Sequence, residues 1–100
     1  MKRNDHRPLR ELSRVLGRVD DPALIEGFLE SLLTPREMRD LGGRWELVKM
    51  LSGGASQRAI ARELHMSLCK ITRGSRELKK PRSPLRRMLD RHLRDRHGRA

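Results

Sequence analysis

The chain has 100 residues, of which 35% are apolar, and its 24 Lys and Arg against 13 Asp and Glu give a formal net charge of +11. This length predicts a single domain, and a chain this basic is suited to polyanionic partners. A single cysteine excludes an intrachain disulfide framework, and we find no signal-peptide core and no apolar run long enough to span a bilayer. The expected compartment is therefore a reducing cytoplasm, without membrane contact.

The positive charge is concentrated in the C-terminal third. Residues 70–100 hold 12 basic and 3 acidic side chains, whereas residues 1–69 hold 12 basic and 10 acidic ones. With one Trp, one Phe and no Tyr, the chain is expected to build a small core. Leucine-rich helix faces would then remain exposed to solvent unless another surface buried them. Dimerisation is the simplest way to cover them.

The N-terminal part is predicted to hold an arm and two helices. Residues 1–8 are polar and basic, and we expect a disordered arm there, followed by a single helical domain over 9–100. Apolar residues recur every three or four positions over 9–18, which predicts one face of a helix. Pro22 suits the first turn of a second helix, whose broad apolar stripe requires cover on most sides.

The junction TPRE gives the clearest local signal in the chain. Thr34 suits the N-cap position and Pro35 the first helical position, and Glu37 completes a capping box. A long helix is therefore expected to begin here and to run to about Ser52, where two glycines end it.

Three shorter helices are expected after this long one. Ser56 can cap a helix over 57–64, and Ser67 can cap one that runs to about residue 79. Ser83 and Pro84 then start the last helix. Because no segment alternates like a β-strand, the expected fold is all-α with six helices.

Residues at about 56–80 have the spacing of a helix-turn-helix. Ile60 would face the core, Ala61 leaves room for a second helix to cross closely, and Ile71 would anchor that second helix. His65 stands where such turns often have a glycine with positive φ, a conformation that histidine tolerates better than most residues.

The outward face of this pair combines short polar side chains with cations. Such a mixture suits the major groove of DNA, where side chains reach base edges and phosphates. The residues are Ser67, Leu68, Cys69, Lys70, Thr72, Arg73 and Arg76, with Gln57 and Arg58 at the start of the first helix, where side chains usually meet phosphate. An ordinary helical hairpin with a solvated face is the alternative.

Three segments resemble the Trp repressor family: LLTPREMRDLGGRW, SQRAIAREL and ITRGSRELK. The resemblance covers about residues 20–93 and is most specific in SQR and ITRGS. It implies a six-helix, intertwined homodimer that represses transcription by binding double-stranded operator DNA when L-tryptophan, the corepressor, is bound. It implies no other cofactor.

The resemblance also implies roles for individual residues. Arg44 and Arg73 would sandwich the indole between their guanidinium planes, and Arg73 would also bind the carboxylate. Leu33 and Thr34 would line the pocket, Leu33 by offering its backbone carbonyl to the ligand amino group. Gly74 would let a flat ligand lie against the helix backbone, or would serve close packing of two helices.

Two further positions, which lie near the ligand in the family, depart from the family pattern. Family members carry a serine where this chain has Glu77 and a threonine where it has Lys70. Glu77 could bind the ligand ammonium group or could pair with Arg73. The connection into SQR is also one residue shorter than in the family.

Three alternatives to a tryptophan-dependent repressor follow from the same residues. The first is a constitutive DNA-binding relative that senses nothing or another small molecule, and the second is an architectural or RNA-binding basic protein. An enzyme is least expected, because the sequence has no nucleophile with a partnered base, no phosphate loop and no metal-ligand spacing.

Overall fold

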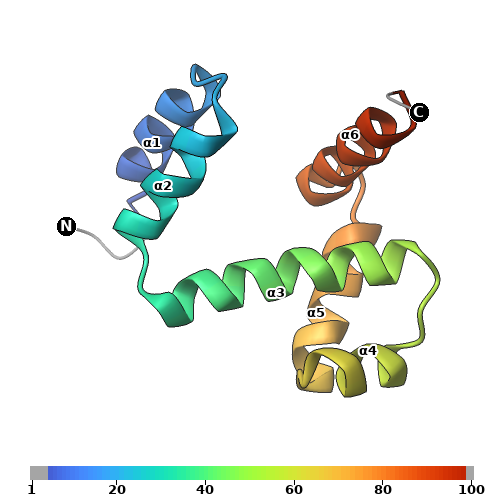
Figure 1. Ribbon diagram of the computed structural model, residues 1–100. Helices are drawn as coiled ribbons and strands as arrows, with labels where there is room; N and C mark the ends of the chain where they lie inside the picture. Colours follow the sequence, from blue (N-terminus) through green and yellow to red (C-terminus); the bar gives the residue numbers. More distant parts are fainter. Residues whose placement is uncertain (1–4, 99–100) are drawn as a thin grey trace. The chain divides into compact units, whose positions relative to one another are not determined.

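The computed structural model describes residues 5–98, which form six α-helices and no strand (Figure 1). The helices are α1 Arg7–Gly17, α2 Pro22–Leu32, α3 Pro35–Ser52, α4 Gln57–Leu64, α5 Leu68–Lys79 and α6 Pro84–Gly98. This confirms the all-α prediction. Within these residues, none of the helices combines the length and hydrophobicity needed to cross a bilayer.

The start of α1 differs from the expected arm. Arg7 and Pro8, which the sequence assigned to a disordered arm, form its first turn, where the missing N–H of proline removes no hydrogen bond. Residues 1–4 of that arm lie outside the described residues.

The chain divides into two compact units, Met1–Met38 and Arg39–Ala100. In the first unit, α1 and α2 bury none of their residues. Four large apolar side chains of these helices are more than half exposed: Leu9, Val15, Leu24 and Leu32. Part of each apolar stripe predicted from the sequence is therefore exposed.

Side-chain caps fix the helix ends that the sequence singled out. The Thr34 N–H donates to Glu37 Oε1 at 2.9 Å, and the Glu37 N–H donates to Thr34 Oγ1 at 3.1 Å, which completes the predicted capping box. Ser56 Oγ accepts from the Ala59 N–H and Ser67 Oγ from the Lys70 N–H.

The last helix is capped in the same way. Ser83 is buried, and its Oγ accepts from the Arg86 N–H at 3.1 Å. The chain reaches Ser83 through Arg82, which has a positive φ of 54°. This short turn connects α5 to α6, which packs against α3 and α5 through Leu89.

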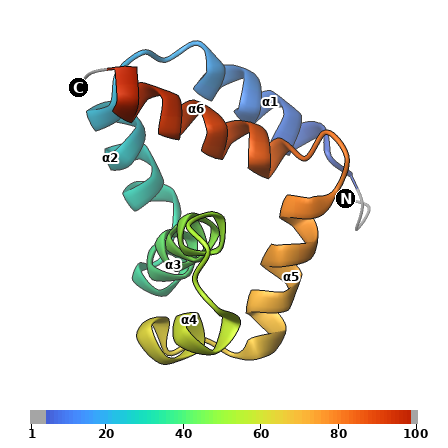
Figure 2. The ribbon, with the colours of Figure 1, turned by 90° about the vertical axis from the view of Figure 1, so that its right-hand side faces the viewer.

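The second unit has two small cores on two sides of α3 (Figure 2, in which α3 is seen nearly end-on). The first core consists of Leu47, Ile60 and Ile71, and the second of Val48, Leu78 and Leu89. Leu47 of α3 thus packs against α4 and α5, and its neighbour Val48 packs against α5 and α6. Ile60 and Ile71 are fully buried, as their spacing predicted.

Replacing His65 with glycine should stabilise the protein. His65 ends α4 in the left-handed conformation, with φ 52° and ψ 45°, where a residue with a Cβ is strained by about 1 kcal/mol relative to glycine. Its side chain is exposed, so little contact is lost. We expect the midpoint of thermal unfolding to rise by about 4–8 °C. His65→Ala keeps the Cβ and is the control; equal midpoints for the two variants would contradict this account.

Candidate functional site

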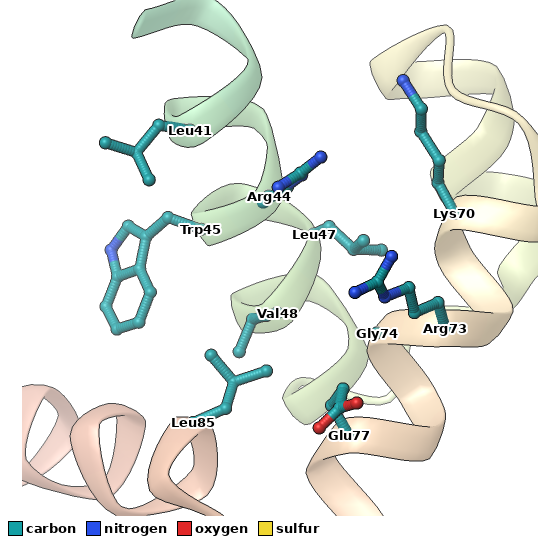
Figure 3. Close-up of a pocket in the computed structure, with 10 residues that line it drawn as sticks. All are labelled: Leu41, Arg44, Trp45, Leu47, Val48, Lys70, Arg73, Gly74, Glu77 and Leu85. Carbon is teal, nitrogen blue, oxygen red and sulfur yellow. The ribbon is translucent and has the colours of Figure 1, made fainter. Parts of the chain in front are cut away.

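A cavity of about 450 Å³ lies between α3 and α5, with Leu85 of α6 at one edge (Figure 3). Its apolar lining consists of Leu41, Trp45, Leu47, Val48 and Leu85, and its remaining lining of Arg44, Lys70, Arg73, Gly74 and Glu77. We call this the α3–α5 cavity. Its volume is within the range of sites that enclose small molecules, and an apolar lining with a few charged groups is typical of such sites.

Two arginines enter this cavity from different helices. Arg44 projects from α3 and Arg73 extends from α5 toward α3 (Figure 3). A guanidinium group is planar, stacks on aromatic faces and pairs bidentately with a carboxylate. Two such groups are chemically suited to a flat molecule that carries a carboxylate.

Gly74 lies on the face of α5 that packs against Leu47 and Leu51 of α3. A Cβ at this position would be 3.1 Å from Leu47 Cδ2 and 3.6 Å from Leu51 Cδ1, so a side chain would force Leu47 to move. Of the two explanations for this glycine, the geometry supports close packing of the two helices. Gly74 also lines the cavity, so the same absence of a side chain keeps that wall flat.

A neighbouring face of α5, which shares Arg73 and Glu77 with the cavity, forms a surface groove. It is lined by Leu68, Cys69, Thr72, Arg73, Arg76, Glu77 and Lys80, and we call it the outer groove. Thr72 Oγ1 lies 3.4 Å from Gln57 Oε1, so a polar contact links α4 and α5 at this surface. Ile71 and Leu78 point the other way, into the two cores.

In this arrangement one face of α5 packs into the two cores, and the face that lines the outer groove is accessible to solvent. Four residues of the predicted DNA surface line the outer groove: Leu68, Cys69 and Arg76, which are exposed, and Thr72, which is half-buried. Arg58 is exposed near the start of α4, and Ser67 is exposed while its hydroxyl caps α5. A model of the family described as Trp repressor protein matches residues 7–93.

The chain belongs to the Trp repressor family. Trp repressor proteins are regulatory DNA-binding proteins rather than enzymes, and this chain is accordingly a DNA-binding transcriptional regulator. No solved structure matches the chain. The match begins earlier than the segment from 20 to 93 in which the sequence resemblance is visible, because it also takes in α1.

Two of the ligand residues implied by the Trp repressor resemblance, Leu33 and Thr34, belong to the first unit, whereas the residues that line the cavity belong to the second. Thr34 has a complete role as the cap of α3. Leu33 follows the end of α2, and its N–H donates to the Leu29 carbonyl at 2.9 Å.

Glu77, where Trp repressors carry a serine, has a partner that the sequence did not suggest. Its Oε1 lies 2.8 Å from Lys80 Nζ, in an ion pair between partly exposed side chains. The hydrogen bond from Lys80 lowers the pKa of Glu77, and the positive charge of Arg73 adds to this more weakly. The carboxylate is thus bound by Lys80 and not by Arg73.

Lys70 and Trp45 also line the cavity. Lys70, expected on the DNA surface and also near the ligand, lines the cavity and not the outer groove. Trp45, which was not identified as a ligand contact from the sequence, packs against the second core, and its ring centroid lies 5.6 Å from that of His92 in an edge-on contact. The three- and four-residue spacing of Lys70, Arg73 and Glu77 is the signal that could have identified one shared face.

Proposed function

We propose that the protein is a homodimeric repressor that binds operator DNA through α4 and α5 when L-tryptophan occupies the α3–α5 cavity. One observation carries this proposal: Arg73 lines both the cavity and the outer groove. A ligand that fixes the Arg73 side chain from the inside therefore acts on a residue of the DNA-facing surface.

The indole would stack between Arg44 and Arg73, over the apolar lining, with the ligand carboxylate bound by Arg73. The ligand can favour the DNA-binding arrangement only through its differential affinity for that arrangement. A tenfold preference for operator requires about 1.4 kcal/mol of coupling between the two sites.

The homodimer is supported by the uncovered apolar faces of the first unit. Monomeric proteins rarely expose large apolar surfaces, and a second copy would cover the exposed Leu and Val side chains of α1 and α2. Helix-turn-helix dimers, the Trp repressor among them, place their second helices in successive major grooves about 34 Å apart. We therefore expect the operator to be palindromic.

A constitutive relative, or one that senses another small molecule, is the second candidate. It is favoured by Lys70 and Glu77, which place two charges in the cavity where Trp repressors have threonine and serine. Both candidates share the DNA-binding half of the proposal.

The test is operator binding with and without L-tryptophan, measured by fluorescence anisotropy on a palindromic trp-operator-like duplex over a range of salt concentrations. We expect at least about tenfold tighter binding with tryptophan, and weaker binding as salt rises. Equal affinities in both conditions, together with no heat on calorimetric titration with tryptophan, would select the constitutive candidate. Equal binding to a scrambled duplex or to RNA would overturn sequence-specific repression.

A further inference from the structure

Along α5, the charged residues that line the cavity change from positive to negative toward the C-terminal end of the helix. Lys70 and Arg73 line the cavity toward the N-terminal end of the helix, Gly74 follows, and Glu77 lines it one turn beyond Arg73 (Figure 3). An α-amino acid has the same polarity, with a carboxylate on one side of its α-carbon and an ammonium group on the other. With its carboxylate at Arg73, its ammonium group would lie toward Glu77.

Glu77 belongs to both surfaces of α5. It lines both the α3–α5 cavity and the outer groove. Lys80 lines the outer groove but not the cavity, and its Nζ lies 2.8 Å from Glu77 Oε1. The pair is easily exchanged, because the Glu77 and Lys80 side chains are 43% and 61% exposed and such pairs contribute little stability.

We propose that the ammonium group of the bound amino acid replaces Lys80 as the partner of Glu77, and that the released Lys80 then binds a DNA phosphate. This inference rests on the proposed function and assigns Lys80 as the residue through which ligand and DNA are coupled. Before exchange, Glu77 and Lys80 neutralise each other. After exchange, the ligand neutralises Glu77, and the outer groove gains one uncompensated positive charge beside Arg73 and Arg76.

The exchange predicts a specific dependence on the ligand ammonium group. L-Tryptophan and indole-3-propionate share the ring and the carboxylate, but only tryptophan has the ammonium group. Lys80→Met removes the competitor for Glu77, so we expect tryptophan to bind up to about fivefold more tightly. Indole-3-propionate should bind the variant and the unaltered protein equally.

Lys79→Met is the matched control, because Lys79 is an exposed neighbour whose loss removes the same charge. It should leave the tryptophan to indole-3-propionate affinity ratio unchanged. All affinities are measured by isothermal titration calorimetry on the full chain. If Lys80→Met and Lys79→Met change the ratio equally, or not at all, the exchange is wrong even though the ligand site stands. If neither ligand binds the unaltered protein, the proposed tryptophan sensing fails, and this inference fails with it.

The DNA side of the exchange is read from the salt dependence of operator binding. Each phosphate contact contributes about 0.9 to the slope of log affinity against log salt concentration. With tryptophan bound, Lys80→Met should reduce this slope by about 0.9 per protomer, and without tryptophan it should change the slope little. An equal reduction in both conditions would mean that Lys80 is always free to bind DNA, and would overturn the coupling.

Discussion

Arg73→Ala should abolish the tryptophan response and weaken operator binding at the same time. The change removes one plane of the sandwich, the bidentate partner of the ligand carboxylate and a cation of the outer groove. A stacked guanidinium and a charge-assisted hydrogen bond together contribute about 2–5 kcal/mol, so tryptophan affinity should fall by at least about thirtyfold. Calorimetric titration measures the ligand, and fluorescence anisotropy measures the operator.

Two further variants separate the roles of this residue. Arg76→Ala removes a cation from the same outer groove but not from the cavity, so it should weaken operator binding and leave tryptophan affinity unchanged. Arg73→Lys keeps the charge but loses the plane, so it should lose most of the ligand affinity while retaining part of the DNA affinity. A full tryptophan response in Arg73→Ala would show that the sandwich does not exist.

Leu24→Glu should convert the dimer to monomer. Leu24 is 58% exposed in the single chain, so if the protein were monomeric the substitution would change its stability by less than about 0.5 kcal/mol. In a dimer that covers the apolar face of α2, it would bury an unpaired carboxylate at the interface, which costs several kcal/mol. We expect a halved mass in sedimentation analysis and loss of operator binding at micromolar concentrations.

Ala23→Glu is the control for this variant. It introduces the same charge in the first turn of α2, where a carboxylate is favoured, at an exposed position outside the apolar stripe. It should leave the mass unchanged. A dimer that tolerates Leu24→Glu would place the interface elsewhere.

The parts of the fold that depend on near neighbours could be predicted from the sequence. The capping box of Thr34 and Glu37 joins residues three positions apart, and the caps at Ser56 and Ser67 act over the same distance. The left-handed conformation of His65 could be predicted too, since a turn of this length between two helices requires it. Such interactions need no knowledge of distant segments.

The site depends on which helix faces which, and here the sequence was insufficient. Lys70 was expected both on the DNA surface and near the ligand, because its charge suits either face of α5, and only the position of α3 places it in the cavity. Gly74 had two explanations until Leu47 was found opposite it. The sequence offered two partners for the Glu77 carboxylate, Arg73 and the ligand ammonium group. In the structure, the turn after α5 places Lys80 beside it instead.

The split between the two faces of α5 has a practical consequence for redesign. Ile71 and Leu78 hold the helix in place, while the exposed side chains at 68, 69 and 76 touch neither core. Surface substitutions of this kind usually change stability by less than about 0.5 kcal/mol. A combinatorial library restricted to these three codons should therefore yield mostly folded proteins, and selection on it can retarget the regulator to new promoters.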